Sequence, residues 1–340
     1  MGVRGFFSSL GDFDMAKRFI RSVLAQDEAV TVSTVVTYDL PVNPLSHVIL
    51  SLKAANDTGT IANYSVWTAL LSSIAKVEVL YKGQAIFSGS LADLMMLQWF
   101  LRGAQPYAGN IVKTNDDVRW ITVVLGFGRR LFDTLQCFPA TRKGELQLQI
   151  TYAAAQTGID TLIAQYETVE LLDAVPASFF KATTLAKTPT ATGWHDLDLP
   201  VGNDLLGALL FSTTVPTGAS FNASVGQVKM LLDNVEFGYS FCNWECLHGE
   251  MLQARPHIFM NEHIHRGNFT TTVEGDTGPQ QEDDTKVQLY SWLEYDPDGT
   301  GEYAIRTSGH SRCNLRINQE PAADAIRCLP VELMRVVGAV

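Results

Sequence analysis

Short runs of apolar and β-branched residues alternate with turn-forming residues along most of the chain after position 27. The segment 147–152, Gln-Leu-Gln-Ile-Thr-Tyr, places polar and apolar side chains on opposite faces of a strand. Comparable runs predict further short strands at 30–38, 48–53, 77–81, 120–125, 206–213, 225–232, 287–295 and 314–318. Many short strands separated by turn residues predict an all-β sandwich or barrel rather than a doubly wound parallel sheet.

The first 26 residues follow a different pattern. Phe6, Leu10, Phe13, Ile20 and Leu24 recur at three-, four- and seven-residue spacings, which lines them along one side of a helix. We therefore expect an N-terminal amphipathic helix with a net basic character. Such a helix either packs on its own domain or a neighbouring subunit, or lies on an anionic lipid surface.

The chain repeats itself with a long period. The segment 39–43, Asp-Leu-Pro-Val-Asn, and the segment 198–202, Asp-Leu-Pro-Val-Gly, are 159 positions apart, and each leads into a predicted strand. Two further pairs of segments follow in the same order: 77–98 matches 235–253, and 145–172 matches 313–336. This duplication predicts two β-sandwiches of like topology, each with a helix-favouring insertion.

The repeat divides the chain into four parts. We expect an N-terminal arm at 1–27, a first sandwich at 28–173, a linker at 174–192 and a second sandwich at 193–340. The linker is indicated by Pro176, Pro189 and a high content of Ala, Thr and Lys.

Two similar sandwiches in tandem resemble the double jelly-roll major capsid proteins. This lineage joins tailless, often membrane-containing bacterial and archaeal viruses with adenovirus. The resemblance covers about 28–338, and the strings Gly-Phe-Gly-Arg at 126–129 and Leu-Phe-Asp at 131–133 are similar to a segment before the last strands of the first barrel. It implies an all-β fold of two tandem eight-stranded jelly-roll β-sandwiches with short helical insertions, here preceded by the amphipathic helix.

The resemblance also implies a function. The resemblance implies that the chain is a viral major capsid protein without enzymatic activity. Its pseudo-hexagonal homotrimers would tile an icosahedral shell around the genome and over an internal membrane. The implied partners are the chain itself, neighbouring trimers, penton and minor capsid proteins and the lipid membrane, with no sequence-specific nucleic acid. The implied location is the capsid shell of the virion, after synthesis in the host cytoplasm.

The arm supplies the residues expected to contact the membrane or the inner shell, because members of this family place their N-termini on the inner side. These residues are Arg4, Phe6, Phe7, Leu10, Phe13, Lys17, Arg18 and Arg21. We expect the acidic stretch 274–284 to point outward instead.

Composition narrows the class of function. The chain has 36 acidic and 25 basic residues and a formal charge of −11, so its surface should be repelled by phosphate. Five Cys without regular spacing favour reduced thiols over a disulfide framework. No apolar stretch approaches the ~18 residues of a membrane-spanning helix, and no secretory signal is visible.

Several patterns carry candidate chemistry. His263 and His265 share one face of a predicted strand, with His257 nearby, but the spacing to the next Glu differs from that of metal-binding cupins. The string Cys242-x3-Cys246-x-His248 has no obvious fourth zinc ligand, so we interpret these thiols as small apolar groups. Calcium binding at 274–284 or at 296–299 stays open, although a β-turn explains 296–299 more simply.

The main alternative is a carbohydrate-binding or carbohydrate-active tandem β-sandwich. It requires exposed aromatic side chains in a groove and, for hydrolysis, two facing carboxyl groups ~5–10 Å apart. Trp99 and Trp120 lie among apolar neighbours in the sequence, which favours packing in a core or a subunit interface.

Overall fold

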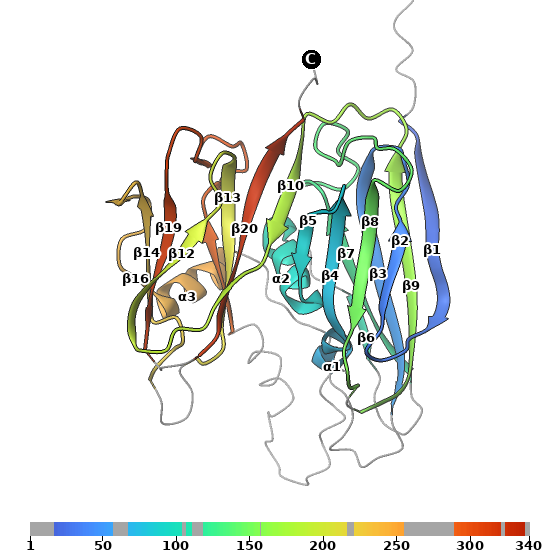
Figure 1. Ribbon diagram of the computed structural model, residues 1–340, viewed down its shortest axis with the longest axis horizontal. Coiled ribbons are helices and arrows are strands. Elements are labelled where there is room, and N and C mark those ends of the chain that lie inside the picture. The colour runs from blue at the N-terminus through green and yellow to red at the C-terminus, as the bar shows by residue number, and fades with distance from the viewer. Residues whose placement is uncertain are drawn as a thin grey trace, which may run out of the picture.

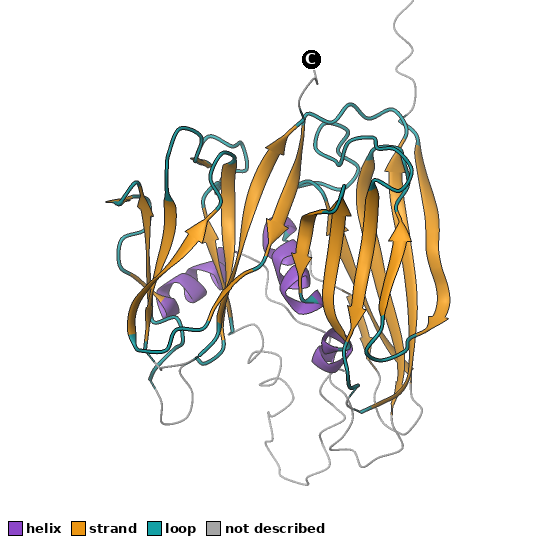
Figure 2. Ribbon diagram, viewed as in Figure 1, coloured by secondary structure: helices purple, strands orange, loops and turns teal. Residues whose placement is uncertain are grey.

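The computed structural model describes residues 17–56, 67–103, 107–110, 118–156, 158–215, 221–254, 289–320 and 324–336. These residues form two β-sandwiches that lie side by side, with three short helices between and beneath the strands (Figures 1 and 2). No helix of the described residues is long and apolar enough to cross a lipid bilayer.

The first sandwich packs two antiparallel sheets over one core. One sheet has the order β1–β9–β3–β7–β6, and the other contributes β2–β8–β4–β5. Leu50 and Tyr166 of the first sheet and Val77 and Leu148 of the second are fully or almost fully buried in this core. The bounds are β1 Phe19–Ala29, β2 Val35–Asp39, β3 Leu45–Asn56, β4 Ile74–Tyr81, β5 Gln84–Gly89, β6 Tyr107–Asn110, β7 Val118–Gly126, β8 Leu146–Tyr152 and β9 Ile159–Leu171, with helices α1 Trp67–Ser72 and α2 Leu91–Arg102.

The second sandwich is built in the same way. One sheet has the order β12–β19–β14–β15, with β16 paired to β14, and the other contributes β17–β13–β20–β10. The bounds are β10 Ser178–Thr183, β11 Leu185–Lys187, β12 Gly193–Leu199, β13 Asp204–Ser212, β14 Gln227–Leu232, β15 Val235–Glu236, β16 Cys242–Asn243, α3 Trp244–Ala254, β17 Tyr290–Glu294, β18 Ile305–Arg306, β19 Cys313–Gln319 and β20 Ile326–Arg335.

The strand orders confirm the predicted duplication but correct its second pair of segments, because 77–79 lies on β4, which corresponds to β14, whereas 235–236 is β15, which corresponds to β5. The order β2–β8–β4–β5 corresponds to β12–β19–β14–β15, and β1–β9–β3–β7 corresponds to β10–β20–β13–β17. The register agrees as well, because Leu45 on β3 pairs with Glu170 on β9, and Leu205 on β13 pairs with Glu332 on β20. Each ladder has a bulge next to this pair. A counterpart of β6 is not found among the residues that the structure describes.

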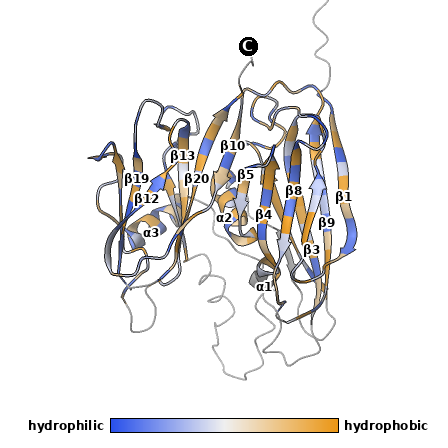
Figure 3. Ribbon diagram, viewed as in Figure 1, coloured by the Kyte–Doolittle hydropathy of each residue, from blue (hydrophilic) through white to orange (hydrophobic). Residues whose placement is uncertain are grey.

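The alternation of side chains explains why these segments form strands. Along β8 the burial alternates residue by residue, and Figure 3 shows hydrophobic and hydrophilic positions interleaved along both sandwiches. The two helices that follow β5 and β15–β16 also correspond to each other. Ser90 caps α2 by accepting a 3.1 Å hydrogen bond from the Asp93 N–H, and Gly103 ends it in the left-handed conformation.

The N-terminal helix expected up to residue 26 is wrong for the part that the structure describes. Phe19–Ala29 is strand β1, which pairs antiparallel with β9 from Phe19 opposite Leu171 to Ala29 opposite Ile163. The apolar positions 19, 20, 23 and 24 fit either geometry locally, and pairing with a neighbouring strand decides between them. Five of the predicted contact residues lie outside the described residues: Arg4, Phe6, Phe7, Leu10 and Phe13.

The segment 174–192, expected as a linker, contains two strands of the second sandwich. Strands β10 and β11 both pair with β20. The alternation that places Phe180 and Ala182 in the core is too short to stand out among the Ala, Thr and Lys residues around it. The boundaries of the four predicted segments stay a prediction.

Candidate functional site

The seam between the two sandwiches is the most extensively built feature of the molecule. Strand β10 lies between β20 of its own sandwich and β5 of the first, and it joins them into one ten-stranded sheet. The contact with β5 is parallel, with Ala182 opposite Phe87 and Thr183 opposite Ser88. Thr184 then donates two hydrogen bonds to the Ser88 carbonyl oxygen, at 2.9 Å from its N–H and 3.0 Å from its hydroxyl.

Gly89 lies at a close approach in the seam. A Cβ atom built on Gly89 would lie 3.1 Å from Thr184 Oγ1 and 3.4 Å from a methyl group of Leu329. A side chain at this position would require the Thr184 hydroxyl to shift by a few tenths of an ångström, so glycine favours the close packing of β5 against the second sandwich.

A buried ion pair crosses the same seam. Asp93, near the start of α2, accepts two hydrogen bonds of 2.9 Å from the guanidinium group of Arg327 on β20 and one of 2.8 Å from the Tyr290 hydroxyl. Asp93 is buried, and the Arg327 guanidinium lies 3.6 Å from the ring centroid of Phe211. Both carboxylate oxygens of Asp93, a residue of the first sandwich, therefore accept hydrogen bonds from side chains of the second sandwich.

Electrostatics keep the Arg327 guanidinium charged. Burial alone would lower the pKa of Arg327, but hydrogen bonding to Asp93 and the charge of its carboxylate raise the pKa above its ordinary value. Burial, followed by the negative charge of Asp93, raises the pKa of Tyr290 well above its ordinary value, so this hydroxyl remains a donor.

A second ion pair and an aromatic contact hold the seam further along. Arg129 donates to the buried carboxylate of Asp296, which also accepts the Gly301 N–H at 2.9 Å. The rings of Phe100 on α2 and Trp292 on β17 are stacked, with 6.2 Å between centroids. The Gly-Phe-Gly-Arg string noted in the sequence thus ends in a residue that ties the first sandwich to the second.

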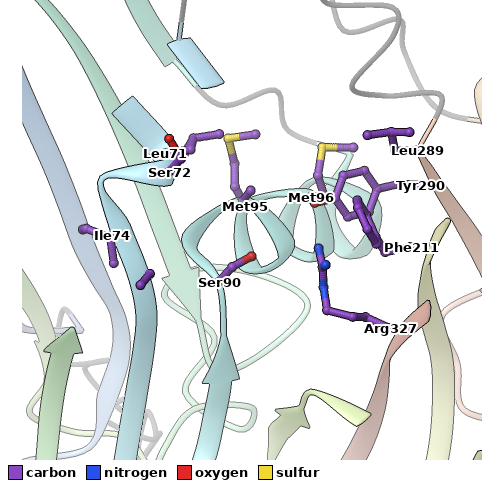
Figure 4. Close-up of a pocket in the computed structure, with 12 residues that line it drawn as sticks. Leu71, Ser72, Ile74, Ser90, Met95, Met96, Phe211, Leu289, Tyr290 and Arg327 are labelled. Atoms are coloured by element: carbon purple, nitrogen blue, oxygen red, sulfur yellow. The ribbon is translucent and has the colours of Figure 1, made fainter. Parts of the chain in front are cut away.

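A cavity of about 350 Å³ lies beside the Asp93–Arg327 pair. Met95 and Met96 of α2 border it on one side, and Phe211, Leu289 and Tyr290 of the second sandwich border it on the other (Figure 4). Its lining is mainly apolar, with Ser72, Ser90 and Arg327 as the polar groups. The cavity carries no cluster of nucleophiles or acids, so its surroundings favour packing over catalysis.

The described residues do not include the histidines that the sequence offers as metal ligands. These are His257, His263 and His265, and the stretch 274–284 also lies outside the described residues. The described residues contain no group of three or more His, Cys, Asp or Glu that could hold a metal ion. His248 instead stacks on Trp244 and contacts the Tyr290 carbonyl oxygen at 2.8 Å through Nδ1.

The predicted β-turn at 296–299 is confirmed. The Gly299 N–H donates a 3.1 Å hydrogen bond to the Asp296 carbonyl oxygen, and Asp298 accepts the Thr300 N–H at 3.0 Å. Since the Asp296 carboxylate binds Arg129, its oxygens serve the seam rather than an empty cation site.

The tryptophans do not line a common groove among the described residues. Trp99, Trp244 and Trp292 are buried, as the sequence indicates for Trp99. Trp120 and Trp194 are partly exposed but belong to different sandwiches. The Lys229 ammonium lies 5.2 Å from the ring centroid of Trp194 and 4.5 Å from that of Phe241.

The described part of the arm lies at the end of the first sandwich. Arg18 forms an ion pair with Asp173 at 3.0 Å, and Arg21 forms one with Glu167. Lys17, Arg18, Phe19 and Phe132 border a small cavity of about 180 Å³. Basic and aromatic side chains therefore occur together where β1 begins.

Sequence reasoning missed the seam. Asp93 and Arg327 are 234 positions apart, and each stands alone among apolar neighbours. An isolated charge in an apolar segment signals a buried partner, but nothing in the sequence indicates which residue that partner is.

Comparison with solved structures identifies the fold, whereas comparison of the sequence finds no relative. No family model and no curated protein matches the sequence. The solved structures that are similar to this chain in fold include the following three. The major capsid protein P2 of bacteriophage PM2 has a TM-score of 0.58 at 12% identity, covering 94% of this chain and 99% of that chain. The major capsid protein of Sulfolobus Turreted Icosahedral Virus has 0.65 at 13%, covering 95% and 100%. PBCV-1 VP54 has 0.58 at 10%, covering 98% of both chains. The chain therefore has the double jelly-roll fold along nearly its whole length.

Proposed function

We propose that this chain is a viral major capsid protein that forms pseudo-hexagonal homotrimeric capsomers, and that these tile an icosahedral shell around the genome and over an internal membrane. The observation that supports this most is the ten-stranded sheet through β5 and β10, which fixes two jelly rolls of like topology as one block. The full-length likeness to two viral major capsid proteins and to PBCV-1 VP54 points to the same role.

A shell subunit needs a fixed angle between its two halves, because a small rotation at the seam would be multiplied across a facet. The seam meets this need through a shared sheet, the Asp93–Arg327 pair and the Arg129–Asp296 pair. Buried ion pairs of this kind contribute geometric specificity more than net stability. The proposed role needs no catalytic step.

The two ends of the molecule differ in a way that suggests its orientation in the shell. Strands β1 and β3 begin at the end where β20 finishes, and both termini of the described chain lie there (Figure 1). The side chains of Arg18 and Arg335 are largely exposed at this end. We assign it to the inside of the shell, next to anionic lipid, and the acidic stretch 274–284 to the outside.

The partners follow from this role. They are the chain itself, neighbouring trimers, penton and minor capsid proteins and the internal membrane, without sequence-specific nucleic acid. The location is the capsid shell of the virion, after synthesis in the host cytoplasm. The carbohydrate alternative is not favoured, since Lys229 contacts the exposed face formed by Trp194 and Phe241.

The proposal is tested by the mass and outline of the purified chain. Size-exclusion chromatography with light scattering should give about three times the chain mass of 37.4 kDa, and averaged electron micrographs should show a hexagonal outline. A persistent monomer that binds glycans would overturn the proposal.

A further inference from the structure

Strands β1 and β10 are the first strands of the two sandwiches, and their surroundings differ. Phe19, Ile20 and Val23 on β1 occupy the positions that Phe180, Lys181 and Thr184 occupy on and after β10, because Ile20 pairs with Glu170 and Lys181 pairs with its counterpart Glu332. Phe180 is 0% exposed, and Lys181 and Thr184 are partly buried. On β1, Phe19 and Ile20 are 57% and 43% exposed, and Val23 is 58% exposed.

The difference arises from the neighbouring strand. Strand β10 is covered on one edge by β20 and on the other by β5. Strand β1 pairs with β9, and its other edge is unpaired among the residues that the structure describes. An eleven-residue edge strand with exposed apolar side chains is unusual in a protein that stays alone, because it invites pairing with another strand.

The counterpart of β5 is exposed at the opposite end of the molecule. Strands β4 and β5 are joined by Lys82 and Gly83, and strands β14 and β15 by Asp233 and Asn234, all with positive φ. Both connections are therefore tight hairpin turns of the same kind. Strand β15 is the last strand of its sheet, and Val235, Phe237 and Phe241 are exposed on and after it.

We propose that β1 of one copy pairs in parallel with the edge formed by 235–240 of a second copy, in the same way as β10 pairs with β5 within the chain. This inference rests on the proposed homotrimer and specifies its interface. It is a head-to-tail contact, because β1 and β14–β16 lie at opposite ends of the long axis (Figure 1). Three copies related by a threefold axis would then close into a ring of six jelly rolls.

Charge agrees with this arrangement. The side chains of Arg18 and Arg21 beside β1 are largely exposed. Glu245 and Glu250 are exposed on α3, the helix that follows the β15 edge. Within the chain the helix α2, which corresponds to α3, contributes the carboxylate of Asp93 to the seam. Exposed carboxylates of α3 therefore follow the edge that would receive β1, and β1 carries the exposed Arg21.

Register specifies which residues meet. Thr183 pairs with Ser88 within the chain. Ser22 corresponds to Thr183, because Ile20 pairs with Glu170 as Lys181 pairs with Glu332. Ser240 corresponds to Ser88, because Met230 bonds to Tyr239 where Val79 pairs with Phe87. Ser22 of one copy should therefore lie next to Ser240 of a second copy.

A cysteine pair tests this register. In a background with Cys242→Ser and Cys246→Ser, the Ser22→Cys, Ser240→Cys double variant should form covalent dimers and trimers on oxidation with copper phenanthroline. Each single variant should remain monomeric under denaturing conditions, since a head-to-tail contact places residue 22 against a different residue. The background without new cysteines is the control.

A charge substitution tests the surface independently. Val23→Glu should reduce the trimer at least tenfold in light scattering while its melting temperature stays near that of Val201→Glu, an exposed substitution in a turn of the second sandwich. A wild-type trimer without cross-links that tolerates Val23→Glu would overturn the inference and leave the proposed function standing. Coverage of β1 by residues 1–16 of its own chain would give this same result. A monomeric wild type would overturn both.

Discussion

Asn203 Nδ2 donates a 2.7 Å hydrogen bond to the buried carboxylate of Glu332. The first sandwich repeats the contact, because Asn43 Nδ2 donates at 2.7 Å to the buried carboxylate of Glu170. In each case the Asn lies just before a long strand, β3 or β13, and the Glu lies on the last strand of the sandwich. The duplication has therefore kept a buried polar contact as well as the strand order.

Replacing either Asn should destabilise the protein. Asn203→Ala and Asn43→Ala should each lower the free energy of unfolding by about 1–3 kcal/mol, because a buried charged acceptor loses a hydrogen bond. Urea unfolding measures the change, with Gln147→Ala on the exposed face of β8 as the control. Losses no larger than that of the control would show that water satisfies the carboxylates.

The strands and their duplication could be predicted from the sequence, because alternation is local and the repeat spans many positions. Strand β8 shows this most clearly, with burial alternating along its whole length. Strand β1 could not, since Phe19, Ile20, Val23 and Leu24 satisfy a helical spacing and only pairing with β9 makes them a strand. Local pattern does not contain that information.

The seam depends on long-range contacts that no local pattern reveals. The Asp93–Arg327 pair joins α2 to β20, and the Arg129–Asp296 pair joins two loops. The sequence shows single charges in apolar surroundings at 93 and 327, but a three-dimensional fold is needed to match them.

The Asp93–Arg327 pair gives a second prediction. Asp93→Ala should lower the free energy of unfolding by about 1–3 kcal/mol, because it leaves a partly buried guanidinium without its hydrogen-bonded partner. The Asp93→Leu, Arg327→Met double variant should lose less than the two single variants added together. Chemical denaturation of the wild type, Asp93→Leu, Arg327→Met and the double variant measures this difference. If the losses of the two single variants add up to the loss of the double variant, the two side chains are not directly coupled.

Gly128 gives a third prediction, which tests close packing next to the seam. A Cβ atom there would lie 2.2 Å from the Gln136 carbonyl oxygen, so Gly128→Ala should lower the free energy of unfolding by about 1–3 kcal/mol. Gly249→Ala is the matched control, because nothing lies within 4 Å of its Cβ position. Since Gly249 is in α3, that change should be neutral or stabilising by up to about 1 kcal/mol. Equal effects at both sites would contradict the packing argument.

The N-terminal arm gives a fourth prediction. The full chain should co-sediment with anionic vesicles, whereas a chain that begins at Lys17 should not, because it lacks Arg4 and the apolar residues before position 14. Neutral vesicles are the control for the charge of the lipid. Equal sedimentation of the two chains would show that the arm contributes no lipid contact.

His47 gives a prediction about pH. It is buried at the start of β3, where its ring contacts Phe132 edge-on and its Nδ1 lies 2.9 Å from Ser46 Oγ. Burial, followed by the positive charges of Arg102 and Arg21, lowers the pKa of His47 from 6.5 to about 4. The unfolded chain therefore binds a proton at this residue at a higher pH than the folded chain does.

The sign of the effect follows from this difference. The contribution of His47 to stability is full above pH 6.5 and is lost as the pH falls from there to about 4. The difference between a pKa of 6.5 in the unfolded chain and about 4 in the folded protein corresponds to about 3 kcal/mol of stability. His47→Gln removes the titrating group and retains a hydrogen-bonding partner for Ser46, so its free energy of unfolding should fall less than that of the wild type over this range. Urea unfolding at several pH values between 7 and 4 measures both slopes, and parallel slopes would mean that His47 is protonated in the folded protein as readily as in the unfolded chain.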